Sequence, residues 1–195
     1  MAEGNEAAGL AAATWKNWSE NLRYDPASDD GHICLPRTRA ELIAVLDYAN
    51  SQPNCVVRVS GQRHSQPPLV ADPGAPSLQQ LQIDLSCYTD LGPAQDQRMI
   101  ADTTAKTVRV NAGVREDELC AFLTENKLML KTVTAGGFFS IGGITAVDVN
   151  GATLDQPIIA GNARAFTLLR ADGQEVTIDA STPQFEAEGT FWDPI

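Results

Sequence analysis

The sequence predicts an α+β fold in which helices and short strands share a core. Two segments have helical periodicity and a polar or acidic start, and short apolar runs of strand length lie between and after them. An Asp-Gly pair between two apolar runs predicts a hairpin near the end of the chain. With 195 residues, the chain is long enough for one core or for two small subdomains.

The first predicted helix lies in "LPRTRAELIAVLDYANSQ". Thr38 and Glu41 have the spacing of a capping box, in which the hydroxyl accepts a backbone N–H and the carboxylate reaches back to another. The apolar stripe of this helix is formed by Leu42, Val45, Leu46 and Ala49. The run "CVVRVS", residues 55–60, then predicts a strand that ends at a glycine turn. A helix that leads into a strand in this way indicates an α/β layer.

The next segments alternate in the same manner. "LQIDLS", residues 81–86, predicts a second strand with Leu81, Ile83 and Leu85 on one face. "RMIADTTAKTVRVNAG" predicts a hairpin that turns at residues 104–106.

A second helix is predicted in "REDELCAFLTENKL". Its stripe is Leu119, Phe122 and Leu123, and the acids near its start suit the helix dipole. A glycine-rich segment follows, and then "AFTLLRADGQEVTIDA" predicts a hairpin with Asp172-Gly173 in the turn.

Composition excludes several classes of function. A formal net charge of -11 argues against a nucleic-acid partner, because phosphate binding needs clustered Lys and Arg. No apolar run approaches the length of a membrane span, and the first residues do not have the pattern of a secretion signal. The cysteines are scattered without a C-x-x-C pair, and with two histidines they predict no metal site. We therefore expect reduced thiols in a cytoplasmic protein.

Two stretches could carry chemistry: residues 60–65 and 136–151, where glycines allow a close backbone approach to a ligand. Neither contains the G-x-G-x-x-G or G-x-x-x-x-G-K-[ST] motif. From spacing alone, the glycines indicate tight turns and strand packing, and His64 indicates a surface or hydrogen-bonded histidine. A hydrolase that uses Ser65 or Ser140 with His64 lacks both the G-x-S-x-G elbow and an oriented acid.

The order of these elements resembles the PCMH-type FAD-binding domain of the vanillyl-alcohol oxidase flavoprotein family. The resemblance rests on "LPRTRAELIAVL", "VRVSGQRHS", "TVRVNAG", "FSIGGITAVDVNG" and "ADG", which occur in the family's order. Within the family, "KNWSENL", "RHSQPPLV" and "AGGFFSIGGITAV" are most similar to the covalently flavinylated cholesterol oxidases. The aldonolactone and alditol oxidases share the "NW" start and follow closely.

The resemblance implies a fold of two α/β subdomains that ends before the family's substrate domain. We expect an N-terminal arm at 1–30, a first FAD subdomain at 31–92 and a second, incomplete one at 93–195. The implied function is FAD-dependent oxidation of a small-molecule alcohol, with a sterol as the candidate substrate, by hydride transfer to a covalently held flavin with O₂ as acceptor. Two alternatives stay open: a sugar-lactone or alditol oxidase, and a non-catalytic flavin-, nucleotide- or partner-binding remnant. A partner chain that supplies the missing half, including the substrate domain, is also expected. No catalytic acid or base can be named within this chain.

The resemblance also implies two flavin loops. In the first, His64 matches the histidine that bonds to the flavin 8α-methyl group, and backbone N–H groups wrap the diphosphate. The first-loop residues are Ser60, Gly61, Gln62, Arg63, His64 and Ser65. The second-loop residues are Ser140, Gly142, Gly143, Ala146, Asn150 and Gly151.

Some residues in and near these loops depart from the family or are expected to have structural roles. Arg63 stands where the family often has Gly or Met, and Asn150 stands where it commonly has His. For Arg63, both a solvated charge and a partner for the diphosphate stay open. His32 is expected in an exposed loop. The larger aromatic residues are expected to be packing anchors: Trp15, Trp18, Phe138 and Phe139.

Overall fold

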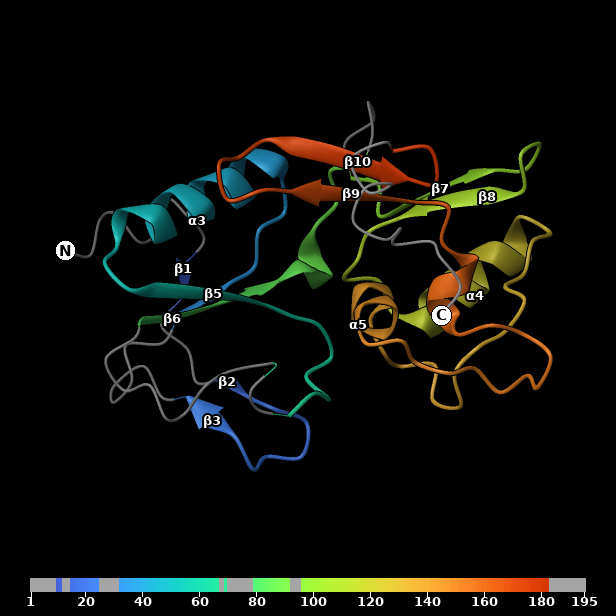
Figure 1. Ribbon diagram of the computed structural model, residues 1–195, viewed down its shortest axis with the longest axis horizontal. Coiled ribbons are helices and arrows are strands. Elements are labelled where there is room, and N and C mark those ends of the chain that lie inside the picture. The colour runs from blue at the N-terminus through green and yellow to red at the C-terminus, as the bar shows by residue number, and fades with distance from the viewer. Residues whose placement is uncertain are drawn as a thin grey trace.

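A four-stranded sheet forms the first part of the molecule (Figure 1). The computed structural model describes residues 10–11, 15–24, 32–66, 69, 79–91 and 96–182. The sheet has the order β1-β4-β6-β5, in which β4 and β5 both pair in parallel with β6, and β1 pairs antiparallel with β4. The strands are β1 (Leu10–Ala11), β4 (His32–Cys34), β5 (Cys55–Ser60) and β6 (Gln79–Asp84).

Helix α3 (Arg39–Ser51) covers one face of this sheet (Figure 1). Val45 and Ala49 are buried against Leu81 and Ile83 of β6, as the helical stripe predicts. Thr38 caps the helix by accepting the N–H of Glu41 at 3.2 Å. The carboxylate of Glu41 reaches one residue further back than a capping box requires and accepts the N–H of Arg37 at 2.6 Å.

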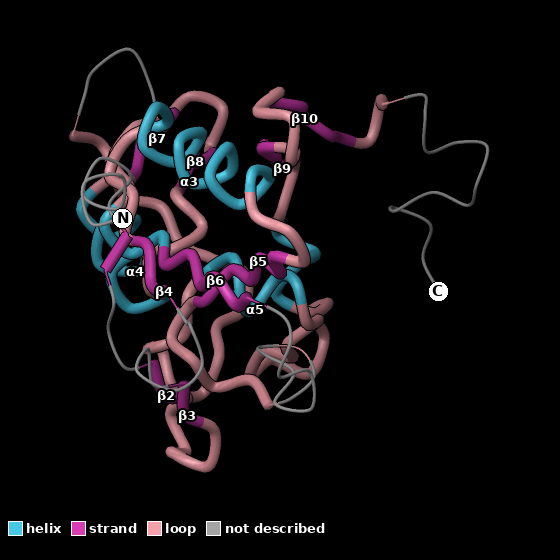
Figure 2. Tube along the Cα trace, turned by 90° about the vertical axis from the view of Figure 1, so that its left-hand side faces the viewer, coloured by secondary structure: helices cyan, strands magenta, loops and turns pink. Residues whose placement is uncertain are grey.

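The opposite side of the sheet carries a hairpin of β2 (Trp15–Lys16) and β3 (Arg23–Tyr24), which both views place away from α3 (Figures 1 and 2). Trp15 is buried there with Leu22 and Ile33, so the prediction of Trp15 as a packing anchor is confirmed. Ile33 belongs to β4, whose alternate residues face opposite sides of the sheet. The hairpin is therefore fixed beneath the strand that leads to α3.

A second core lies around α4 (Glu116–Glu125) and the hairpin of β7 (Met99–Asp102) and β8 (Thr107–Val110). Leu119 and Leu123 are buried in it as predicted, whereas Phe122 is half-buried. The predicted turn is confirmed, because Asp102 accepts the N–H groups of Thr104 and Ala105.

Short contacts join the two cores. The side-chain amide of Asn111 donates to the carbonyls of Leu85 and Tyr88 at 2.9 and 2.6 Å. Gly113 lies so close to Leu85 that an added Cβ would stand 2.2 Å from its backbone. Only glycine permits that approach.

The last hairpin, β9 (Ala165–Leu169) and β10 (Glu175–Asp179), returns to the first helix and lies alongside α3 (Figure 1). Asn50 donates to the carbonyl of Ala171 at 2.8 Å, and Arg39 pairs with Glu175 at 3.5 Å. Gly173 has a φ of +75° in the turn, which agrees with the predicted Asp-Gly hairpin. The 3-10 helix η2 (Ile159–Asn162) precedes this hairpin.

Three local predictions are wrong. The second strand ends at Asp84, because that side chain accepts the N–H of Ser86 at 2.9 Å and starts the 3-10 helix η1 (Leu85–Cys87). The glycine-rich segment contains a helix, α5 (Ile141–Ala146), where the sequence predicts a loop. His32 begins β4 and does not lie in a loop. The predicted subdomain boundaries stay a prediction.

Candidate functional site

The first candidate loop follows directly from β5, which ends at Ser60. The backbone N–H groups of residues 61–65 donate no hydrogen bond to any residue that the structure describes. Arg63 has a φ of 63°, the left-handed conformation that turns neighbouring N–H groups toward a common point. Free N–H groups arranged in this way can donate to an anion such as a phosphate.

Gly61 brings the first loop against the second. An added Cβ would lie 2.0 Å from the hydroxyl oxygen of Ser140, a distance that no side chain can occupy. Ser60 and Ser140 are each 3% exposed, so their hydroxyls face the protein interior. The hydroxyl of Ser60 accepts the indole N–H of Trp15 at 3.2 Å. The two buried serine side chains therefore lie on the interior side of the two loops.

The side chain of Arg63 is held by the scaffold. Its guanidinium pairs with Asp84 at 3.4 Å and lies 6.0 Å from the ring centre of Trp15. Asp84 is the last residue of the neighbouring strand β6, so the pair links the loop to the sheet.

Three aromatic rings surround the imidazole of His64. Trp18 is stacked on it at a centroid distance of 4.9 Å, and Phe138 and Phe139 lie at 5.2 and 4.7 Å. Burial among these rings lowers the pKa of His64 from its usual 6.5, so the neutral imidazole is favoured. The expectation that Trp18 is a packing anchor is wrong, because 68% of its surface is exposed.

The second candidate loop is more tightly bound to the protein than the sequence predicts. Ser140 caps α5 by accepting the N–H of Gly143 at 3.3 Å, and Gly142 donates to the carbonyl of Ala112 at 2.8 Å. A Cβ on Gly142 would lie 2.8 Å from that of Ala112. These two N–H groups are used inside the protein, and the glycines serve close packing.

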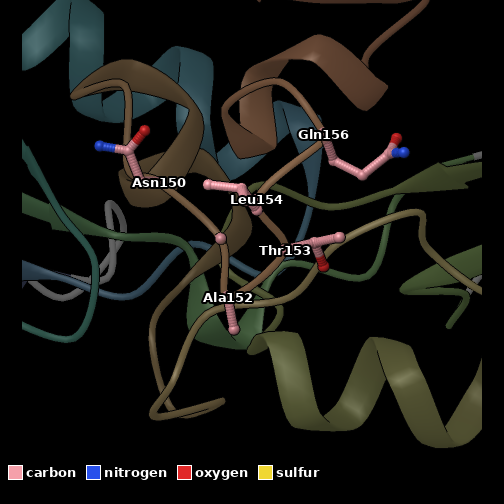
Figure 3. Close-up of a pocket in the computed structure, with 6 residues that line it drawn as sticks. Asn150, Ala152, Thr153, Leu154 and Gln156 are labelled. Atoms are coloured by element: carbon pink, nitrogen blue, oxygen red, sulfur yellow. The ribbon is translucent and has the colours of Figure 1, made fainter.

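The later residues of the second loop lie around a different feature. Ala146 and Asn150 are exposed, and an added Cβ on Gly151 would lie 1.9 Å from the hydroxyl of Thr132. A shallow hollow of about 370 Å³ is lined by Asn150, Gly151, Ala152, Thr153, Leu154 and Gln156. The side chains of Asn150 and Gln156 point away from each other there (Figure 3). No first-loop residue lines this hollow.

Sequence reasoning missed a buried carboxylate behind the aromatic pair. Glu116 is fully buried and accepts both the backbone N–H and the hydroxyl of Thr134. The hydroxyl of Thr134 in turn accepts the N–H of Gly137 at 3.2 Å, and the N–H of Glu116 donates to the carbonyl of Phe139 at 2.9 Å. Glu116 thus fixes the segment that carries the two phenylalanines. In the sequence it is one of several acids at a helix start, and no local pattern marks it as buried.

Other features of the described residues bear on the class of site. Among them no group of three or more His, Cys, Asp and Glu side chains is placed to hold a metal ion. No helix in the described part of the chain is long and apolar enough to cross a membrane. The four cysteines are free, and burial raises the pKa of Cys34 to about 12. Such a thiol is a packing residue and not a nucleophile.

Comparison with known proteins identifies the family. Residues 31–179 match the family described as FAD binding domain. The chain belongs to this family. Its fold is the PCMH-type FAD-binding domain, as predicted: a cholesterol oxidase from B. sterolicum superposes with a TM-score of 0.70 at 20% identity, over 90% of this chain and 33% of that one. A solvent-stable cholesterol oxidase superposes with a TM-score of 0.64 at 22% identity, over 87% and 32%.

Two relatives are similar in sequence. An alditol oxidase from Streptomyces sp. is 29% identical over 170 residues, which are 87% of this chain and 36% of the relative. A D-arabinono-1,4-lactone oxidase from Eremothecium gossypii is 27% identical over 179 residues, which are 91% of this chain and 31% of the relative. The chain thus spans about a third of the length of these proteins.

FAD is the cofactor of this domain, and the predicted cofactor is confirmed. The residues present fit it. The free N–H groups of residues 61–65 suit a diphosphate, and Gly61 leaves no side chain between the two loops.

Proposed function

We propose that the chain is the FAD-holding part of an oxidase that removes a hydride from an alcohol and passes the electrons to O₂. The run of free N–H groups at residues 61–65 carries this proposal, since it matches what a diphosphate requires. FAD supplies the acceptor for the hydride when it is bound. The residues of this chain hold and orient the cofactor, and none of those described is assigned as the acid or base of the reaction.

We further propose that His64 tethers the flavin. Its neutral imidazole, favoured by the lowered pKa, offers a nitrogen lone pair. This unprotonated nitrogen would bond to the 8α-carbon of the flavin, and the other ring nitrogen of His64 would release its proton. The 8α-methyl group would give up one hydrogen, and bound FAD would supply the two-electron acceptor for the step, with O₂ as the final oxidant. The tether prevents loss of the cofactor.

The substrate class we propose is an alcohol, and sugar alcohols are the first to test. The alditol oxidase and the lactone oxidase are the sequence relatives, at 29% and 27% identity. The cholesterol oxidases, at 20% and 22% identity, support the fold, so a sterol is the second class and an aldonolactone the third. We also propose a cytoplasmic location, which the four free cysteines favour.

The second candidate function is a non-catalytic FAD-binding module, because the matched family is described only as an FAD binding domain. One experiment separates the two. The purified chain is incubated with FAD, desalted, and its visible spectrum recorded before and after anaerobic addition of a sugar alcohol, an aldonolactone or a sterol. Bleaching of bound flavin by one substrate supports the oxidase, whereas bound flavin that none of them bleaches supports the module. A colourless protein contradicts both.

A further inference from the structure

The aromatic rings around His64 form a side-chain cluster that is separate from the backbone N–H groups of residues 61–65. We call the rings of Trp18, Phe138 and Phe139 the aromatic box. Its members come from two segments far apart in sequence, and all three have centroids within 5.2 Å of the imidazole centroid. Centroid distances of about 4.5–7 Å are those at which aromatic pairs attract. The box therefore restricts the orientation of the imidazole from several sides.

The first side of the box is locked to the His64 loop by hydrogen bonds. The backbone N–H of Trp18 donates to the carbonyl of Arg63 at 2.7 Å. The amide of Asn21 donates to Gln66 at 3.0 Å, and Gln66 donates to the hydroxyl of Ser19 at 2.9 Å. Hydrogen bonds from the β2–β3 hairpin thus hold the loop at Arg63 and at Gln66, on either side of His64.

The exposure of Trp18 shows that burial does not explain its place. With 68% of its surface exposed, this side chain gains little from the hydrophobic effect. Its neighbour Asn17 is 1% exposed and accepts the N–H of Leu22 at 3.1 Å, which fixes the turn that presents the indole. The exposed indole of Trp18 is therefore held in place by the turn that the buried Asn17 amide fixes, and not by its own burial.

The second side of the box is held by the buried carboxylate described above. Glu116 donates its backbone N–H to Phe139, and its side chain fixes Thr134. Gly136 is needed as well, because a Cβ there would stand 2.7 Å from the ring of Phe138. Both sides are thus built on rigid parts of the two cores.

Some charged side chains on the packed elements form ion pairs with one another. Arg63 pairs with Asp84, and on the hairpin Lys16 pairs with Glu20 at 2.6 Å. Near the phenylalanines, Arg115 pairs with Asp117. Burial among the rings is the cause that lowers the pKa of the imidazole.

We propose that the aromatic box is the positioning device that holds the imidazole of His64 in one orientation and partly shields it from water for attachment to the flavin. This role rests on the tether proposed above. Trp18, Phe138 and Phe139 are positioning residues, because they act through His64.

The first test needs no flavin. The chain has two histidines, so His32 serves as an internal reference in a proton–carbon NMR titration, and the His64→Ala variant assigns the signals. In the wild type, the His64 signal should be displaced by the ring currents and should titrate below 6.5. Trp18→Ala should move both properties toward those of a solvated histidine, whereas Trp18→Phe should retain them. Met129→Ala, at a side chain that is 86% exposed, is the control for loss of exposed apolar surface.

The second test measures attachment. The 195-residue chain is incubated with FAD, and acid-stable flavin is followed over time. Trp18→Ala should slow attachment by roughly threefold to tenfold, the factor that an aromatic pair is worth, while Trp18→Phe stays near the wild-type rate. Equal rates in wild type and Trp18→Ala, or an unchanged His64 titration, overturn the role of the box. A wild type that binds FAD without ever forming acid-stable flavin refutes the tether itself, and the box then has no attachment to position.

Discussion

Replacing Gly61 with Ala tests the junction of the two loops. The added Cβ would lie 2.0 Å from the hydroxyl oxygen of Ser140 and 3.0 Å from its Cβ, whereas real Cβ contacts stay beyond 3.0 Å. The φ angle of Gly61 is not in the left-handed region, so the cost is steric alone. Overpacking of a buried site costs about 1–3 kcal/mol. If Ser140 turns away, the cap of α5 is lost for about 1 kcal/mol more. Gly61→Ala should therefore lower the free energy of unfolding by about 2–4 kcal/mol.

Urea unfolding followed by tryptophan fluorescence measures this change, and FAD titration measures the cradle. Ser140→Ala is the matched control, because it removes the cap without the clash. Combining Gly61→Ala with Ser140→Gly removes the colliding atoms, so the double variant should lose less stability than the sum of the losses in Gly61→Ala and in Ser140→Gly alone. FAD affinity should fall with Gly61→Ala and partly return in the double variant. A Gly61→Ala protein within about 0.5 kcal/mol of the wild type, or strict additivity, would refute the contact.

Two further predictions concern the second core. Thr134→Val keeps the shape of the side chain but removes the hydroxyl that is bonded to the buried Glu116. The free energy of unfolding, measured in urea, should therefore fall by about 1–3 kcal/mol. An unchanged urea midpoint of unfolding would contradict a stabilising Glu116–Thr134 hydrogen bond. Partial burial would raise the pKa of Glu118, but hydrogen bonds from the Arg115 N–H and from Arg98 outweigh it and hold the pKa below 4.5. Stability from this carboxylate is complete above pH 4.5 and is lost as the pH falls through the lower folded value, so Glu118→Gln should flatten the acid side of a stability–pH curve.

Local patterns predicted the elements well where the determining contacts are short in sequence. Thr38 caps α3 and Val45 faces the core because capping and helical periodicity act within one or two turns. The strand "CVVRVS" was predicted to the residue, since a glycine turn bounds it. The end of the next strand was missed, because the Asp84 side chain competes with the ladder for the backbone.

The candidate site shows where sequence reasoning stops. The family resemblance placed His64 and Gly61 in the first loop, and the structure adds free N–H groups and a close approach to Ser140 there. The roles of Trp18 and Phe139 could not be predicted, because their contacts with His64 join segments that no local pattern connects. The residue type alone does not distinguish an aromatic side chain that packs in a core from one that contacts His64.

The central claim is that residues 61–65 hold FAD and that His64 tethers it. The most direct measurement is acid precipitation of the wild type and of His64→Ala after equal incubation with FAD, followed by flavin absorbance in pellet and supernatant. We expect flavin in the wild-type pellet. In His64→Ala we expect flavin that binds before precipitation but is released entirely to the supernatant. Flavin that stays in the His64→Ala pellet, or a wild type that binds none, would contradict this claim.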